Sequence, residues 1–406
     1  MHVVIFEGSH WADFAPLTLT RPVFQLFSGT ATLLEKQLRA TRPTRVTLWV
    51  RDELADYTRT KVAAALGVPA TVNTPLDDEP ALIFAGRTLH FATLERPPSE
   101  CVVVEDDGLI KLAYARRPGL SHEDVLNRTE AWTSLHDLPR SMPQARFGRH
   151  WGDLMAWNEE SLLSDSIYWD EAPPAGGHQV QPENIHARAG VTVMPGAVLD
   201  ASHGPILLDS GCVIGANAVI EGPVYIGRQT RVTPNAYIRS GTSLGPNCRI
   251  GGEVSNCVFI GYSNKSHEGF MGDSYVGEWV NCGAGTTTSN LKSTYGEVRL
   301  TIGSRQLDSG RMFLGAGLGD HAKLATNTLL PSGAYVGVGS MVALSRRAPK
   351  FTASFRFVTD DADEPMSVGK AAEVAGRMQQ RRGIHFDALD RVALEAAARS
   401  AATVEA

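Results

Sequence analysis

Polar side chains that can do chemistry gather where the regular middle of the chain is interrupted. One interruption reads SNKSHEGF at 263–270, and a second spans 286–296. In and between them are five side chains that can exchange protons or bind polar groups: His267, Lys265, Asn281, Asn290 and Lys292. A histidine titrates near neutral pH and can act as a general base, while lysine and asparagine can bind phosphate or hydroxyl groups. The two stretches therefore predict a binding or catalytic site.

The segment that must position these residues has a period of six. Aliphatic residues recur at every sixth position, at Leu208, Ile214, Ile220, Ile226, Val232, Ile238, Leu244 and Ile250. The pattern resumes near Val276 and returns after Leu318, and glycines often follow the aliphatic residue. A period of six fits neither a helix nor a flat strand, and is typical of the hexapeptide repeat of a parallel β-helix.

A three-sided coil explains the repeat physically. Each six-residue unit forms one short face, the aliphatic side chain points inward, and glycine or another small residue allows the sharp turn. Interruptions of such a coil become loops on a rigid scaffold, where binding residues are common. The alternative is a glycine-rich β-sandwich with accidental periodicity.

Changes in composition predict four segments. Residues 1–170 alternate strand-like and helical stretches, which indicates an α/β domain with a mostly parallel sheet. Residues 171–184 contain APPAGG and are expected to be a linker, and 185–345 to be the β-helix. Residues 346–406 are expected to form a C-terminal extension with amphipathic helices around a break at Gly383.

Composition excludes several classes of protein. The chain has 406 residues and a formal net charge of -6, with no long basic run, which argues against nucleic-acid or anionic-membrane binding as its main task. No apolar run approaches the roughly 20 residues of a membrane span, and the first residues do not read as a signal peptide. Five cysteines without a CxxC pair do not predict a disulfide framework or a zinc ribbon. We expect a cytoplasmic protein.

Residues 264–290, NKSHEGFMGDSYVGEWVNCGAGTTTSN, resemble the active-site stretch of the bifunctional GlmU family. Blocks such as GGEVSN at 251–256 and GDHAK at 319–323 resemble a GlmU-like branch of sugar nucleotidyltransferases. The resemblance implies a left-handed β-helix, acetyl-CoA as co-substrate and a homotrimer with the acetyl site between subunits.

The resemblance also implies roles for residues of the β-helix. His267 would be the general base that takes a proton from a sugar amine as the amine attacks the acetyl thioester. Asn281 would contact the sugar substrate. Ala284 would lie at the acetyl group and Thr326 at the coenzyme, and Lys323 is expected to bind the coenzyme or another anion.

This chain departs from the family where the sugar phosphate would bind. Phe270 stands at the position of a tyrosine hydroxyl, and Tyr237 and Asn256 stand at positions of basic residues. The substrate-binding candidates that remain, including cations able to replace the missing charge, are Arg239, Lys265, Asn290 and Lys292.

The N-terminal stretch at 15–38 resembles the opening of sugar nucleotidyltransferases, in which loop N–H groups hold nucleotide phosphates. The loop here is EGSHWA at 7–12, with the single glycine Gly8, and Val23 occupies the usual lysine position. Arg21, Lys36 and Arg87 are the candidate replacement cations. If the domain is active it needs Mg²⁺, and Asp106 is the candidate ligand.

These features favour a bifunctional enzyme that uses a sugar-1-phosphate, a nucleoside triphosphate and acetyl-CoA. Two alternatives stay open: nucleotidyl transfer alone, with the β-helix as an oligomerisation scaffold, and a non-catalytic trimer that binds a nucleotide sugar. A β-helical carbonic anhydrase is disfavoured, because no histidines are paired at short ligand spacing.

Overall fold

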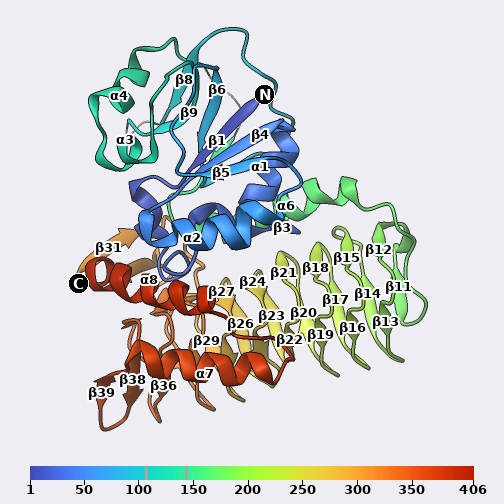
Figure 1. Cartoon of the computed structure of the whole chain (residues 1–406). Helices are drawn as coiled ribbons and strands as arrows, with labels where there is room; N and C mark the ends of the chain where they lie inside the picture. Colours follow the sequence, from blue (N-terminus) through green and yellow to red (C-terminus); the bar gives the residue numbers. More distant parts are fainter. Residues whose placement is uncertain (106–107, 142–144) are drawn as a thin grey trace.

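The computed structural model describes residues 1–105, 108–141 and 145–406. An N-terminal α/β domain lies on one side of a long β-solenoid, and two C-terminal helices lie along the far end of that solenoid (Figure 1). Within the described residues, no helix is both long and apolar enough to cross a membrane.

The N-terminal domain is built on one six-stranded sheet. In spatial order its strands are β5 (Ala70–Val72), β4 (Arg45–Trp49), β1 (His2–Phe6), β6 (Ala81–Ala85), β9 (Ile110–Ala115) and β8 (Cys101–Val104). The first four are parallel, whereas β9 runs antiparallel to both β6 and β8. The chain leaves β1 for β4 on one side and later returns to β6 on the other. The crevice at the carboxyl ends of β1 and β6 is therefore where such sheets bind ligands.

Short strands and helices complete this domain. The helices are α1 (Leu33–Thr41), α2 (Ala55–Tyr57), α3 (His122–Asn127), α4 (Glu130–Thr133), α5 (Trp151–Ala156) and α6 (Asn158–Asp165). Strands β2 (Phe27–Ser28) and β3 (Ala31–Thr32) pair antiparallel as a short hairpin. Strands β7 (Thr88–Leu89) and β10 (Arg146–Phe147) also pair antiparallel. A capping box between Thr32 and Glu35 starts α1.

The solenoid is the predicted left-handed parallel β-helix, with about 10 turns. Its first face contains β11 (His178–Val180), β14 (Val198–Asp200), β17 (Val219–Glu221), β20 (Tyr237–Ile238), β23 (Glu253–Ser255) and β26 (Phe270–Gly272). The second contains β12 (Ile185–Ala187), β15 (Ile206–Leu208), β18 (Val224–Ile226), β21 (Thr242–Leu244), β24 (Val258–Gly261), β27 (Tyr275–Glu278), β32 (Ala316–Leu318), β35 (Ala334–Val336) and β37 (Phe351–Thr352). The third contains β13 (Thr192–Val193), β16 (Val213–Ile214), β19 (Arg231–Val232), β22 (Arg249–Ile250), β25 (Asn264–Lys265), β28 (Asn281–Cys282), β33 (Lys323–Leu324), β36 (Met341–Ala343), β38 (Arg356–Thr359) and the antiparallel β39 (Asp363–Pro365).

The six-residue pattern fixes the register of the first coils. Leu208 pairs with Ile226 and Ile226 with Leu244, so residues 18 positions apart stack on one face. All eight predicted aliphatic positions lie in one buried cluster inside the prism. The parallel pairing between coils satisfies the backbone N–H and C=O groups while the aliphatic side chains fill the interior.

The predicted interruptions change the length of the coils. Ile250 pairs with Lys265, only 15 positions later, so a lysine takes an interior position that the pattern reserves for an aliphatic residue. Cys282 pairs with Leu324, because a 24-residue excursion is inserted after β29 (Thr287–Thr288), which pairs with β34 (Leu329–Leu330). The excursion holds a hairpin of β30 (Arg299–Ile302) and β31 (Arg305–Asp308).

Four cysteines belong to the prism interior: Cys212, Cys248, Cys257 and Cys282. All five cysteines are buried and free of disulfides. Burial raises the pKa of Cys212, Cys248 and Cys282 to about 12 and that of Cys257 still further. These thiols therefore act as small apolar core residues.

The N-terminal domain packs tightly on the second face of the β-helix. Phe27 and Trp151 share a buried cluster with Tyr225 and Tyr275 of β18 and β27. The Tyr275 hydroxyl accepts from the Phe27 N–H and donates to the Phe27 carbonyl oxygen, both at 2.6 Å. The N-terminal domain and the β-helix therefore share a buried interface and are not two units joined only by a linker.

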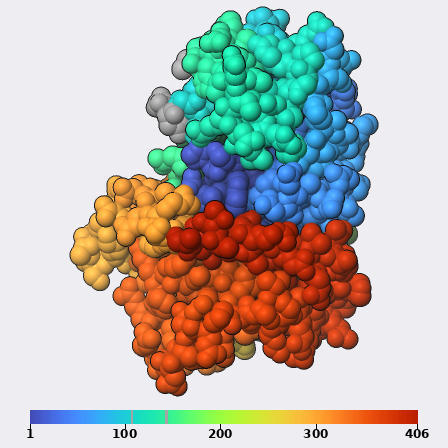
Figure 2. Space-filling model, turned by 60° about the vertical axis from the view of Figure 1, so that its left-hand side comes forward, coloured from blue at the N-terminus to red at the C-terminus, as the bar shows by residue number. Residues whose placement is uncertain are grey.

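The C-terminal segment begins as solenoid and ends as helices. Strands β37, β38 and β39 extend the coil beyond residue 345, and β11 starts it within the 171–184 segment. The predicted helices are confirmed as α7 (Val368–Gln380) and α8 (Ala388–Val404), separated by a turn in which Gly383 has φ 69°. Figure 2 shows the red C-terminal helix lying directly beneath the blue N-terminal domain. Lys61 of that domain pairs with Asp387 at the start of α8.

Candidate functional site

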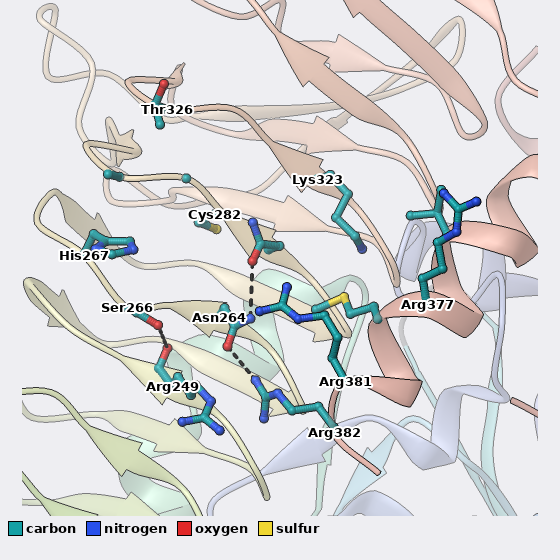
Figure 3. A pocket seen from close by; sticks show the side chains of 15 residues that line it. Arg249, Asn264, Ser266, His267, Cys282, Lys323, Thr326, Arg377, Arg381 and Arg382 are labelled. Atoms are coloured by element: carbon teal, nitrogen blue, oxygen red, sulfur yellow. Dashed lines mark hydrogen bonds between the residues drawn. The ribbon is translucent and has the colours of Figure 1, made fainter. Parts of the chain in front are cut away.

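A large cavity, with a volume of about 820 Å³, lies between the third face of the β-helix and α7. Figure 3 shows His267 and Thr326 on the β-helix side of the cavity. Arg377 of α7, and Arg381 and Arg382 just after α7, extend into the cavity from the opposite side. Four predicted site residues from successive coils meet here: His267, Asn281, Ala284 and Thr326. Lys323 also lines the cavity.

Successive coils bring these residues to one corner of the prism. The Gly285 N–H donates to the carbonyl oxygen of Glu268 at 3.0 Å, and the Asn327 N–H donates to that of Ala284 at 2.6 Å. The corner turns that carry His267, Ala284 and Thr326 are thus stacked one above another. A Cβ at Gly283 would lie 2.5 Å from backbone atoms of the next coil, so the coils can approach this closely only with glycine there.

His267 is exposed at the start of its corner, where its imidazole is open to the cavity. Lys265, predicted to bind substrate, instead lies inside the prism at 1% exposure. Its Nζ donates to the carbonyl oxygens of Gly251 at 2.9 Å and His267 at 3.0 Å. Burial lowers the pKa of Lys265, and its ammonium group holds the backbone of the histidine in place rather than facing the cavity.

Asn281 is oriented by a chain of hydrogen bonds that begins in the C-terminal segment. Arg382 donates to Oδ1 of Asn264 at 2.6 Å, and Nδ2 of Asn264 donates to Oδ1 of Asn281 at 3.3 Å. A guanidinium can only donate, so each amide in the chain has its direction fixed. Asn281 is left with its own NH₂ group as the donor available to a ligand.

Lys323 is held by its neighbours at the wall of the cavity. Its Nζ donates to the carbonyl oxygens of Trp279 and His321, each at 2.8 Å. Burial lowers the pKa of Lys323 to about 7, so the amine loses its charge near neutral pH. It can still supply a positive charge to an anion below that pH.

The other predicted sugar-binding residues lie elsewhere. Arg239 and Asn290 line a different cavity of about 600 Å³ beside the first face, together with Phe270 and Asp273. Asn290 donates to Asp273 at 2.6 Å, and burial raises the pKa of that carboxyl. Lys292 is in the excursion, where its Nζ donates to the Glu297 carbonyl oxygen. The structure therefore does not bring these three residues to His267.

Two of the four nucleotide-binding candidates come together. Gly8 and Arg87 line a small cavity of about 30 Å³ at the carboxyl ends of β1 and β6, the crevice expected from the strand order. Gly8 has φ 69°, a conformation that favours glycine. The Arg87 guanidinium lies 4.0 Å from the ring centroid of Phe147 and donates to the Gly148 carbonyl oxygen.

Arg21 and Lys36 do not line that cavity and are engaged in buried ion pairs. Arg21 binds Asp320 and Glu278 of the β-helix, and Lys36 binds Asp165 at 2.6 Å. The expectation that these two cations replace the family lysine finds no support in this arrangement, because their charges are already compensated. Each joins distant parts of the chain instead.

Asp106, the candidate Mg²⁺ ligand, lies outside the described residues. Among the residues that are described, no three His, Cys, Asp or Glu side chains are grouped so that they could hold a metal ion.

Sequence reasoning missed the arginines of the C-terminal segment. Arg377, Arg381 and Arg382 line the main cavity, and Arg249 faces it from β22. A signal was present, since residues 377–382 read RMQQRR and place two arginines four apart on one helical face. What the pattern did not show is which surface that face would meet.

Comparison with known proteins supports the N-terminal assignment. Residues 3–166 match the family described as sugar nucleotidyl transferase. The match covers most of the N-terminal domain and no part of the β-helix. The matched residues include the loop at 7–12, in which Gly8 is the single glycine.

Two bifunctional enzymes are among the similar curated proteins. The chain is 35% identical over 136 residues to a bifunctional sugar-1-phosphate nucleotidylyltransferase/acetyltransferase of Sulfurisphaera tokodaii, covering 33% of this chain and 34% of that protein. It is 31% identical over 191 residues to the bifunctional protein GlmU of Alkalilimnicola ehrlichii, covering 47% and 35%. The matches thus span about a third of the length of these relatives.

Among solved structures, the chain aligns with the polySia-specific acetyltransferase NeuO. The identity is 12% and the TM-score 0.26, covering 48% of this chain and 99% of that one. So low a score supports no conclusion about this protein.

Proposed function

We propose that the β-helix catalyses transfer of an acetyl group from acetyl-CoA to the amino group of a sugar-1-phosphate. The observation that carries this proposal is the meeting of His267, Asn281, Ala284 and Thr326 on the wall of one large cavity. The similarity to bifunctional nucleotidylyltransferase/acetyltransferases supports the same chemistry.

His267 would take the proton from the attacking amine, because its exposed imidazole faces the cavity and no carboxylate of the described chain bonds to it. The amine nitrogen forms the C–N bond and the C–S bond of the thioester breaks. The imidazolium of His267 then returns its proton to the leaving thiolate, which departs as the thiol. The NH₂ group of Asn281 would donate to an oxygen of the substrate or of the tetrahedral intermediate, because its Oδ1 already accepts from Asn264. Lys265 keeps the histidine backbone fixed.

The test is thiol release from acetyl-CoA in the presence of glucosamine-1-phosphate. We expect His267→Gln to lower kcat by about 10²- to 10⁴-fold, the usual contribution of a general base. His203→Gln is the matched control, since His203 is an exposed histidine on another turn of the same β-helix. Equal turnover by His267→Gln and the wild type would refute the assignment of the base.

A second candidate function is nucleotidyl transfer by the N-terminal domain, which its family match favours. Gly8 and Arg87 at the sheet crevice would contact the nucleotide phosphates. Pyrophosphate release from nucleoside triphosphates, screened against sugar-1-phosphates, tests it. A lack of pyrophosphate with every pair would leave the domain a structural partner of the β-helix.

Assembly and location are parts of the same proposal. We propose a homotrimer in the cytoplasm, by analogy with the GlmU resemblance and consistent with free, buried cysteines. Sedimentation of the full chain measures the first, and fractionation of cells the second.

A further inference from the structure

The cavity wall holds four arginines, and three of them have no ion-pair partner among the described residues. The fifteen residues that line it include Arg249, Arg377, Arg381, Arg382 and Lys323, and no aspartate or glutamate. Arg377 pairs with Glu373 on its own helix. Among the described residues, no carboxylate forms an ion pair with Arg249, Arg381 or Arg382.

The fold forces these like charges together. Arg249 belongs to β22, whereas Arg381 and Arg382 follow α7, more than 130 positions later. Burial lowers the pKa of Arg382, and the nearby positive charges of Arg249, Arg381 and Arg231 lower it further. Guanidinium groups gathered without acidic partners repel one another, and a ligand with several negative oxygens removes that cost.

The helix that presents the arginines is firmly seated. Ser367 caps the start of α7 by accepting from the Lys370 N–H, and Ala371, Ala372 and Ala375 are buried against the end of the β-helix and α8. Arg382 anchors the helix end by donating to the Asn247 carbonyl oxygen at 2.7 Å and to Asn264. The second wall of the cavity is thus a fixed element of the same chain.

The arginines and His267 lie on one continuous cavity. Arg382 bonds to Asn264, Asn264 bonds to Asn281, and Asn281 shares the cavity wall with His267. A ligand held by its phosphoryl groups at the arginines could therefore extend toward the imidazole. The cavity volume of about 820 Å³ is of the size that accommodates such a ligand.

We propose that Arg249, Arg381 and Arg382 form, within a single chain, a cleft that binds the phosphoryl groups of a substrate. The acyl chemistry rests on the proposed function, but the cleft does not. Two substrates could supply these groups: the nucleotide part of the acetyl donor, or the phosphate of the sugar acceptor.

Binding measured by calorimetry on the full chain tests the proposal without requiring turnover. The probes are coenzyme A, 3′-dephospho-coenzyme A, pantetheine and glucosamine-1-phosphate. We expect Arg249→Gln and Arg381→Gln each to weaken coenzyme A binding about tenfold or more, the effect of losing one charge-assisted hydrogen bond. Arg346→Gln is the matched control, because that arginine is exposed on the β-helix outside this cavity.

The probes separate the two sources. Loss confined to coenzyme A and its dephospho form, with pantetheine unaffected, assigns the cleft to the donor. Loss confined to glucosamine-1-phosphate assigns it to the acceptor, and either result supports the cleft. Unchanged binding of every probe in the Arg249→Gln/Arg381→Gln double variant overturns it, as does an absence of binding to the folded wild type.

The same measurements keep the two proposals apart. Arginine-dependent binding without thiol release would contradict acetyl transfer and leave the cleft standing. Turnover that depends on His267 but not on the arginines would support acetyl transfer and contradict the cleft.

Discussion

Arg21 offers the sharpest test of how the N-terminal domain is joined to the β-helix. Its guanidinium binds the Asp320 carboxylate and lies 3.3 Å from that of Glu278, and the side chains of Arg21 and Asp320 are 6% and 5% exposed. Replacing it with methionine keeps much of the volume but leaves two carboxylates without their cation. We expect Arg21→Met to lower the free energy of unfolding at pH 7.

The expected loss in the free energy of unfolding depends on the hydrogen bonds and solvent exposure that the two carboxylates retain without Arg21. Breaking a buried ion pair on one side typically costs about 3–5 kcal/mol. Asp320 retains the Thr20 hydroxyl at 2.7 Å and the Glu278 N–H at 2.8 Å, and the Glu278 side chain is 29% exposed. The lower end, about 3 kcal/mol, is therefore expected.

The loss must also depend on pH in a defined direction. Burial already raises the pKa of Glu278, and Arg21 opposes that rise. Without Arg21, the folded state holds Glu278 with a pKa above that of the unfolded chain, so the folded state binds more protons and gains stability as pH falls. The deficit of Arg21→Met should shrink between pH 7 and pH 5.

Guanidinium unfolding followed by tryptophan fluorescence measures the effect. Arg59→Met is the control, because Arg59 forms an exposed pair with Asp56, and it should change stability by less than about 1 kcal/mol. Asp320→Asn added to Arg21→Met should recover part of the loss. If Arg21→Met were as stable as the wild type and instead weakened nucleotide binding, the reasoning would be refuted and the phosphate role restored.

Two further predictions concern the solenoid and the pH response of the α/β domain. A Cβ at Gly245 would lie 2.0 Å from the Ile260 carbonyl oxygen of the next coil, so Gly245→Ala should cost about 4 kcal/mol or more in thermal or denaturant unfolding, whereas Gly67→Ala, with no atom within 4 Å, should be nearly neutral. Equal stability of these two variants would contradict the close stacking. Burial, with a smaller effect of the Lys111 charge, lowers the pKa of His90 to about 4. The unfolded chain therefore takes up the His90 proton at higher pH than the folded chain does. The free energy of unfolding should fall as pH drops from about 6.5 to 4, by at most about 3 kcal/mol. His90→Leu should flatten that part of the stability–pH curve, and an unchanged slope would show that His90 is not its source.

The β-helix could be predicted from sequence because its pattern is local and physical. Every sixth side chain must point into the prism, so the spacing of Leu208, Ile226 and Leu244 predicts that they stack on one another. The corner that carries His267 was predictable for the same reason, as the place where that pattern stops. The inward position of Lys265 was not, since it depends on a coil of 15 residues that only the three-dimensional pairing reveals.

The charges were the harder part. Whether Arg21 or Lys36 is available for phosphate depends on Asp320 and Asp165, which are 299 and 129 positions away. Nothing in the sequence near either cation indicates these partners. The helix α7 was predicted from its amphipathic pattern, but the surface it covers is set by tertiary packing, and so its arginines were not connected with the cavity.

The sealed cysteines give the solenoid an internal set of reporters. Cys212, Cys248, Cys257 and Cys282 belong to the buried core of the prism and follow one another along the coil. In a structure held by nearest-neighbour contacts, loosening can start at an end and spread coil by coil. The order in which these thiols become open to alkylation during denaturation would then trace the direction in which the spiral comes apart.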